Sequence, residues 1–395
     1  MANRFVLNET SYHGKGAIES IPEEAKARGF KKALVCSDPD LVKFGVTAKV
    51  TDLLDKAGLA YELYSNIKPN PTIENVQQGV KALHDAGADY MIAIGGGSSM
   101  DTAKAVGIID KNPEFADVRS LEGVAPTKNP CTPIFAVPTT AGTAAEVTIN
   151  YVITDVEKDR KMVCVDVHDI PVVAFVDPDM MSSMPKGLTA ATGMDALTHA
   201  VEAYIGNSTT PGTRKNALDA VQLIFENLDR AYTNGSDKEA RKNMLRASYF
   251  AGCAFTKSYV GYVHAVAHTL GGQYNVPHGL ANAVLLPFVL ESYGDTIHSK
   301  LARLALTAGV ADSSTPEKEA AHAFIQAVKD MKKRFNIGDT IPEIKEEDIP
   351  KLAHYADKEG NPLYPVPVLM DAHELEKFYY ILMDKKQEDT SNESE

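Results

Sequence analysis

The chain has 395 residues, of which 44% are hydrophobic and 24% are charged, and its 40 basic and 53 acidic residues give a formal net charge of −13. This length exceeds what one hydrophobic core usually serves, so we expect about two domains. The acidic balance argues against nucleic acid or an anionic membrane as a partner, because both are themselves negatively charged.

The cysteines and the amino terminus indicate where in the cell the protein is located. The chain has four cysteines that lie far apart and form no Cys-x-x-Cys pair. We interpret them as buried free thiols in a reducing environment. The amino terminus has no apolar signal core, and no stretch approaches the roughly 20 apolar residues of a membrane span. We therefore predict a cytoplasmic protein.

Short apolar runs ended by turn residues mark strands in the first half of the chain. These runs cover residues 32–36, 89–94, 133–137 and 172–176. Unbroken apolar strands separated by helix-length segments are typical of a parallel sheet covered on both faces. Residues 147–155 and 160–166 alternate more loosely and predict a β-hairpin added to that sheet. We expect an α/β, Rossmann-like nucleotide-binding domain over residues 1–184.

Polar residues follow two of these strands. Asp38 comes just after the first strand, where a carboxylate can accept both adenosine ribose hydroxyls and repel the 2′-phosphate of NADP. Three hydroxyls follow the third predicted strand, from Thr139, Thr140 and Thr143. Ligands of open α/β sheets collect at the carboxyl ends of strands. Ordinary polar turns are the alternative in both places.

Three consecutive glycines, Gly95 to Gly97, lie between the second predicted strand and a helix. Such a backbone can approach a ligand closely, and the free N–H groups of the following helix attract a pyrophosphate. The motif is neither a GxGxxG fingerprint nor a Walker loop. A glycine-rich turn without a ligand is the alternative. We also expect Ser98 and Asp101 to form a capping box on this helix.

After about residue 184 helical patterns replace the strands. Two sets of apolar residues recur at helical spacing: Met194, Leu197, Val201 and Tyr204, and then Val221, Ile224, Phe225 and Leu228. We expect an all-helical domain over residues 185–385. The wholly polar tail at residues 386–395 is predicted to be disordered.

Acid and histidine pairs in this helical half predict a metal site. Asp195 and His199 are four residues apart and share a helix face opposite the first apolar stripe. Further on, His264, His268 and His278 fall within 15 residues, the first two one helical turn apart. Each residue alone is more often solvated or hydrogen-bonded, but the two pairs together favour a divalent cation held by rigid elements. The spacing leaves open which of the three histidines coordinate.

These motifs, in this order, resemble the iron-containing (group III) alcohol dehydrogenases over essentially the whole chain. The resemblance rests on Gly95–Ser98, Pro138–Thr143, Gly193–His199 and His264–His268. It implies hydride transfer between NAD(H) and a small alcohol or aldehyde. Lactaldehyde and 1,2-propanediol come first among the implied substrates, with 1,3-propanediol, butanol or ethanol as alternatives.

The resemblance also implies residue roles. It identifies Asp195, His199, His264 and His278 as ligands of Fe²⁺, for which Zn²⁺ or another divalent metal is the alternative. It places His268 in the active site as a catalytic residue. It implies cofactor contacts from ten residues: Asp38, Asn70, Gly96, Gly97, Ser98, Thr139, Thr140, Thr143, Asn150 and Lys161. A homodimer is the expected assembly.

The sequence is also compatible with two other functions. One is a lyase like dehydroquinate synthase, which retains and recycles NAD. Its substrate is a phosphorylated acid, and few Lys or Arg residues lie near the candidate ligands in the sequence. The other is a protein without catalytic activity that binds a cofactor and keeps the metal only for stability.

Overall fold

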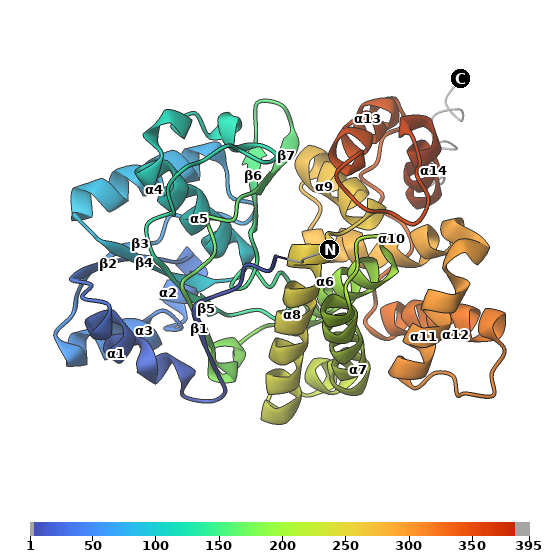
Figure 1. The fold of residues 1–395 in the computed structure, drawn as a ribbon, viewed down its shortest axis with the longest axis horizontal. Coiled ribbons are helices and arrows are strands. Elements are labelled where there is room, and N and C mark those ends of the chain that lie inside the picture. Colours follow the sequence, from blue (N-terminus) through green and yellow to red (C-terminus); the bar gives the residue numbers. More distant parts are fainter. Residues whose placement is uncertain (1–3, 384–395) are drawn as a thin grey trace, which may run out of the picture.

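The computed structural model describes residues 4–383, so the predicted tail at 386–395 lies outside the described residues. An α/β half and a helical half lie side by side (Figure 1). The strands are β1 (Thr10–His13), β2 (Lys32–Cys36), β3 (Ala60–Tyr64), β4 (Tyr90–Gly95), β5 (Ile134–Pro138), β6 (Asn150–Asp155), β7 (Arg160–Val165) and β8 (Val173–Val176).

The helices of the α/β half are α1 (Ile21–Ala27), α2 (Pro39–Lys43), α3 (Ala48–Ala57), α4 (Ile73–Ala86) and α5 (Gly97–Lys111). Those of the helical half are α6 (Lys186–Ile205), α7 (Pro211–Thr233), α8 (Lys238–Ser258), α9 (Tyr262–Tyr274), α10 (His278–Tyr293), α11 (His298–Ala308), α12 (Glu317–Arg334), α13 (Ile349–Gly360) and α14 (Ala372–Leu382). Short 3₁₀ helices link them at η1 (Ala17–Ser20), η2 (Pro113–Phe115), η3 (Val118–Leu121), η4 (Pro178–Met181), η5 (Gly294–Ile297) and η6 (Glu346–Asp348).

The main sheet has six strands in the order β1-β8-β5-β4-β2-β3, and every neighbouring pair is parallel. This confirms the predicted parallel sheet. Sequence patterns missed the two edge strands, β1 and β3. An edge strand pairs on one side only, and these two carry polar or exposed residues instead of an apolar run.

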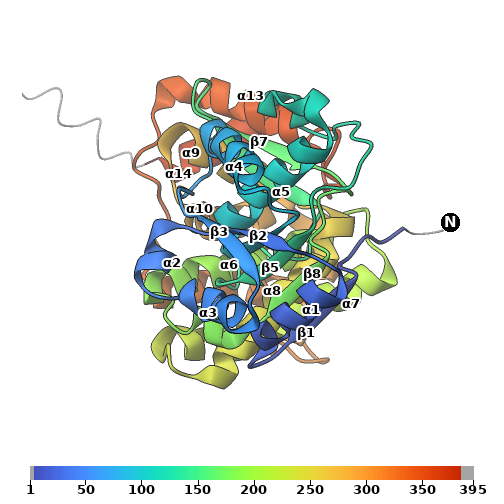
Figure 2. The same ribbon diagram turned by 90° about the vertical axis from the view of Figure 1, so that its left-hand side faces the viewer.

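Helices cover both faces of this sheet, as its apolar strands require. Within β2, Leu34 and Cys36 pack on one face with α4 and α5, while Ala33 and Val35 pack on the other face with α1 and α3. Figure 2 shows α4 and α5 on one side of the strands and α1 and α3 on the other. Burial on both faces excludes water from the sheet and explains why its central strands contain no alternating polar residues.

The predicted hairpin forms, but it is not part of the main sheet. Strands β6 and β7 pair antiparallel as a separate two-stranded sheet. It lies between the two halves, with β6 against α5 and β7 against α9 (Figure 1). The prediction of the two strands was correct, but the prediction that they join the main sheet was wrong. Pairing between segments that are distant in the sequence leaves no local signal.

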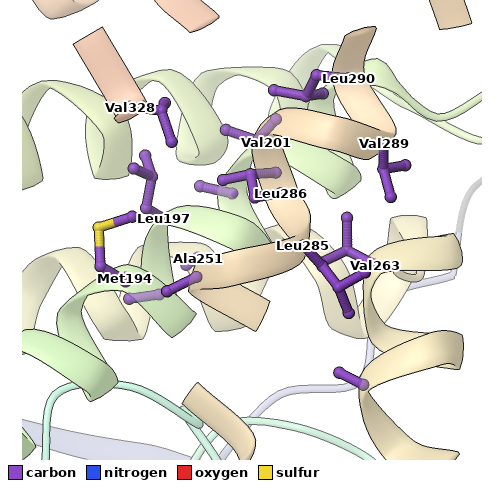
Figure 3. Close-up of a cluster of buried hydrophobic side chains, with 14 of the residues drawn as sticks. Met194, Leu197, Val201, Ala251, Val263, Leu285, Leu286, Val289, Leu290 and Val328 are labelled. Atoms are coloured by element: carbon purple, nitrogen blue, oxygen red, sulfur yellow. The ribbon is translucent and has the colours of Figure 1, made fainter. Parts of the chain in front are cut away.

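The helical half is built around a second core. Capping boxes begin α7 and α14, where Thr210 and Asp371 accept the N–H of the third helical residue. Residues of α6, α8, α9, α10 and α12 interdigitate in this core, as Figure 3 shows for Met194, Leu197 and Val201 of α6. The face of α6 opposite this stripe is not solvated as an amphipathic pattern implies: every residue from Gly193 to Ile205 is buried. Among residues 4–383, no helix combines the length and apolar character needed to cross a bilayer.

Candidate metal centre and cofactor edge

Four predicted ligands converge in the helical half. Asp195 and His199 come from α6, His264 from α9 and His278 from the first residue of α10. One donor atom from each of the four lies within 4.8 Å of the other three. The structure therefore brings together the four residues that the family resemblance implied.

Close helix packing produces this convergence. A Cβ on Gly279 would lie 2.8 Å from the carbonyl carbon of Ala191 in α6, so only glycine lets α10 begin so near that helix. His278, the preceding residue, is thereby placed 3.5 Å from the Asp195 carboxylate, measured from Nε2 to Oδ1. The approach of two backbones sets the position of this ligand.

Glu202 supports His264 from behind and was missed by the sequence analysis. His264 Nδ1 donates to Glu202 Oε2 at 2.6 Å, and the N–H of Val263 donates to the other oxygen at 2.8 Å. This leaves His264 Nε2 directed at the ligand cluster, since a ligating histidine usually donates its second nitrogen to a carboxylate. A signal was present, because Glu202 follows His199 by three residues on the same helix.

Asn282 is a second buried residue that sequence reasoning missed. Its Nδ2 donates to Asp195 Oδ1 at 2.7 Å and lies 3.1–3.2 Å from the Nε2 atoms of His264 and His278. It follows His278 by one helical turn, so helical spacing puts it on the same face of α10 as that ligand. The amide nitrogen therefore lies against three of the four donors and donates to the carboxylate among them.

Burial sets the protonation of the ligand set. It lowers the pKa of His199 and of His278 well below the ordinary value, so both imidazoles are neutral and able to donate a lone pair. Burial also raises the pKa of Asp195. For His264 burial acts to lower the pKa, but the hydrogen bond and charge of Glu202 outweigh it and raise the pKa. A proton and a cation therefore compete for His264.

The donor set fits a divalent transition metal. Three imidazoles and one carboxylate match the ligands that iron, zinc and cobalt accept, and the four come from rigid helices. His278 Nδ1 is buried without a hydrogen-bond partner among residues 4–383. The imidazole of His199 is packed between the rings of Phe255 and His264, with centroids 4.2 and 4.4 Å away. These contacts restrict ring rotation and keep the donors in place.

His268 lies beside the ligands but outside their cluster. Its ring stacks on that of His278 with centroids 5.0 Å apart, and its Nδ1 donates to Glu359 Oε1 at 2.7 Å. Glu359 belongs to α13, 91 residues further along the chain, and no sequence pattern pointed to it.

Several predicted cofactor contacts lie along one edge of the sheet. Strands β2, β4 and β5 are adjacent and parallel, so the loops after them emerge at the same edge. The loops are also in contact: a Cβ on Gly96 would be 3.2 Å from Thr140 Cγ2, and one on Gly97 would be 3.0 Å from Thr143 Cγ2. Gly96, Gly97, Thr140 and Thr143 therefore meet, with Ser98 and Thr139 next to them in the chain.

The predicted capping box on α5 is wrong. The N-cap residue is Gly96, and no side chain caps this helix. Asp101 instead accepts the N–H of Val152 in β6 at 3.0 Å. It holds the hairpin against α5, because β6 packs on that helix. The first N–H groups of α5 lack a side-chain acceptor, which suits them to an anion.

The other predicted cofactor contacts are placed around this edge. Asp38 caps the short helix α2 by accepting the N–H of Leu41 at 2.8 Å. It therefore has the structural role of an ordinary polar turn residue, which was the alternative to cofactor binding. Asn70 reaches the helical half, where its Nδ2 donates to Asn275 Oδ1 at 2.5 Å. Asn150 begins β6, and its carbonyl accepts from the buried Lys104 at 2.8 Å.

Lys161 lies between the other predicted cofactor contacts and the metal ligands. It lies on β7, and a Cβ on Gly271 of α9 would be 2.8 Å from its Cε. Burial lowers the pKa of Lys161 to about 8, against the opposing influence of Asp101 and Asp195. The candidate cofactor edge and the metal cluster thus meet where the hairpin packs against α9.

Comparison with known proteins agrees with this arrangement. Residues 8–178 match the family model described as iron-containing alcohol dehydrogenase, and residues 189–380 match its C-terminal counterpart. The chain is 51% identical to lactaldehyde reductase of Escherichia coli (strain K12) over 358 residues, which are 90% of this chain and 93% of that protein. It is 39% identical to 1,3-propanediol dehydrogenase of Citrobacter freundii over 361 residues, 90% and 93% of the two chains.

Solved structures extend the agreement to the fold. An alcohol dehydrogenase from Oenococcus oeni superposes with a TM-score of 0.91 at 38% identity, covering 96% of this chain and all of that one. The family models cover both halves, including all four converging residues and the glycine-rich turn. The chain therefore belongs to the iron-containing alcohol dehydrogenases, a family of oxidoreductases.

Proposed function

We propose that this chain transfers a hydride between NAD(H) and a small alcohol or aldehyde, with a divalent metal held by Asp195, His199, His264 and His278. The observation that carries the proposal is the convergence of these four donors within 4.8 Å beside the carboxyl edge of a parallel sheet. Fe²⁺ is the proposed metal, in keeping with the family, and the same donors suit Zn²⁺.

The metal would supply Lewis acidity, which lowers the pKa of an alcohol hydroxyl and polarises an aldehyde carbonyl. The residues of the chain orient the reactants around it. Glu202 and Asn282 hold the donor side chains of His264 and Asp195 in place. In this proposal His268 carries the proton between the hydroxyl and solvent, because it lies next to the ligands without belonging to their cluster.

The dinucleotide would lie along the edge formed by Gly96, Gly97, Ser98 and the loop from Thr139 to Thr143. The uncapped N-terminus of α5 supports a pyrophosphate there. Asp38 would accept the adenosine ribose hydroxyls, while Asn70, Asn150 and Lys161 would complete the contacts toward the metal. Bound in this way, the nicotinamide would lie at the junction of the two halves, beside the proposed substrate position.

Lactaldehyde and 1,2-propanediol are the proposed substrates. They follow from the 51% identity to a lactaldehyde reductase, while the 39% identity to a 1,3-propanediol dehydrogenase supports 1,3-propanediol as the alternative. We also propose a division into an NAD-binding domain at residues 1–184 and a metal-binding domain at 185–385. A homodimer in the cytoplasm completes the proposal, and the four buried free cysteines suit a reducing compartment.

A substrate panel under anaerobic conditions tests the proposal. Protein loaded with Fe²⁺ should oxidise NADH in the presence of lactaldehyde, and His264→Ala should abolish this turnover together with metal retention. His373→Ala is the matched control, because that side chain is 91% exposed on α14. Substrate consumption without net NADH loss would indicate a lyase. If no substrate is turned over and His264→Ala only lowers the melting temperature, the metal has a purely structural role.

A further inference from the structure

A buried hydrogen-bond chain reaches His268 from the carboxyl-terminal part of the protein. Tyr364 OH donates to Glu359 Oε1 at 2.8 Å, and the same oxygen accepts from His268 Nδ1 at 2.7 Å. The side chain of Glu359 is 14% exposed, and Tyr364 is buried. The carboxylate is therefore mostly buried, and among residues 4–383 it accepts hydrogen bonds from this hydroxyl and this imidazole.

The end of α13 that carries Glu359 is clamped onto α9. A Cβ on Gly360 would lie 2.9 Å from the ring of Tyr262, the first residue of α9. Tyr262 OH donates to Asn361 Oδ1 at 2.8 Å and accepts the N–H of Met370 at 2.9 Å. Because α9 also carries His268, the carboxylate and the imidazole belong to elements that cannot shift independently.

The hydrogen bond of the His268 imidazole leaves one ring nitrogen available for proton transfer. His268 is stacked on His278, and among residues 4–383 its ring makes one hydrogen bond, through Nδ1. A carboxylate can only accept, so it keeps the proton on Nδ1 and leaves the lone pair on Nε2. Nε2 is the nitrogen able to receive a proton from a substrate hydroxyl.

We propose that Glu359, held by Tyr364, is a positioning residue that fixes His268 as its Nδ1–H tautomer with Nε2 facing the substrate. This inference rests on the proposed function, in which His268 moves the proton. It differs from that proposal in assigning the orientation of the imidazole to the carboxyl-terminal segment. That segment lies outside both the metal ligands and the cofactor edge.

Imidazole ¹⁵N spectra of the zinc-loaded protein test the assignment directly. In protein labelled at the histidine ring, His268, identified by its loss in His268→Asn, should show a protonated Nδ1 and an unprotonated Nε2. Glu359→Ala should remove this signature. Glu359→Gln should keep it, because the amide oxygen can still accept from Nδ1.

Kinetics separate positioning from a general structural effect. Glu359→Ala should lower kcat by about 10–100-fold, the range found when a metal-bound histidine loses its carboxylate partner. These rates are measured on the Fe²⁺-loaded protein, and KM for the alcohol, iron content and NADH affinity should be unchanged. NADH affinity is measured from the change in NADH fluorescence on binding. Glu359→Gln should recover most of the rate, and Tyr364→Phe should cause a smaller loss.

Tyr274→Phe is the matched control, since Tyr274 OH donates to the carboxylate of Asp348 at 2.7 Å. This hydrogen bond also joins α9 to α13, because Tyr274 ends α9 and Asp348 is the N-cap of α13. It should alter neither the spectrum nor kcat. The inference is overturned if the Nδ1–H signature persists in Glu359→Ala, or if it disappears while kcat stays at the wild-type value. Failure of the proposed function looks different: the wild-type protein would show no NADH turnover, and the spectra would still report the tautomer.

Discussion

At the scale of single residues, the candidate centre depends on groups that stand behind the four donors. Glu202 accepts from both His264 and the backbone N–H of Val263, and it is almost fully buried. A carboxylate in this place orients the imidazole and increases its basicity. The four donors alone therefore describe only part of what binds a cation here.

Glu202→Gln should weaken metal binding by about 10–100-fold, because one amide oxygen cannot accept from both donors and the charge is lost. Competition with a chromogenic chelator measures the affinity. Glu226→Gln on the exposed side of α7 is the control and should bind metal like the wild type. Equal affinities for the two variants would contradict an orienting role for Glu202.

Asp38 has two separable roles at the same scale. It caps α2, and in our proposal its charge also rejects the 2′-phosphate of NADP. Asp38→Asn retains an oxygen for the cap, since Asn and Asp cap equally well, but removes the charge. The ratio of kcat/KM for NADPH to that for NADH should rise while the melting temperature is unchanged. An unaltered ratio would show that Asp38 has only the capping role.

At the scale of elements, the contact of α8 with the loop after β5 sets the spacing of the two halves. A Cβ on Gly252 would lie 2.5 Å from Ala144 Cβ and 2.6 Å from Val147 Cγ1. Gly252→Ala should lower the free energy of unfolding by about 1–3 kcal/mol, the usual cost of overpacking a filled core. Denaturant unfolding measures this.

Gly187→Ala in α6 is the matched helical control, because nothing lies within 4 Å of a Cβ at that position. It should be neutral or stabilise the protein by up to about 1 kcal/mol, since alanine restricts the unfolded chain. If the two substitutions have the same effect, packing against α8 does not determine how the halves meet.

At the scale of the whole molecule, Glu146 makes stability depend on pH. It lies in the loop between β5 and β6, is 2% exposed, and its Oε1 has no hydrogen-bond partner among residues 4–383. Burial raises its pKa from 4.5 to about 7. Between these pH values the folded protein binds a proton that the unfolded chain has lost, so the contribution of Glu146 to stability falls as pH rises through this range.

Glu146→Gln should remove this dependence. The variant should equal the wild type below pH 4.5 and be more stable above pH 7, by roughly 3 kcal/mol. Free energies of unfolding measured across this pH range test it, with the exposed Glu23→Gln as control. A wild-type advantage at pH 8 would mean that the buried carboxylate has a favourable partner in solution.

The sequence by itself determined the central strands and the approximate place of the site. Strands β2, β4, β5 and β8 are apolar because both of their faces are buried, and such apolar runs can be recognised in the sequence alone. Asp195 with His199, and His264 with His268, share helix faces at a spacing of four residues, so local geometry already paired them. Selection of the four ligands needed the family resemblance in addition.

Only the tertiary structure decided what depends on distant segments. The hairpin forms its own sheet, Asp101 bonds β6 instead of capping α5, and Glu359 reaches His268 from 91 residues away. Glu202 and Asn282 follow the ligands at helical spacing, yet spacing alone cannot distinguish a supporting residue from a solvated one. Side-chain hydrogen bonds between elements depend on how helices and strands pack. Periodic apolar residues show which face of an element is buried, but they do not show which other element packs against that face.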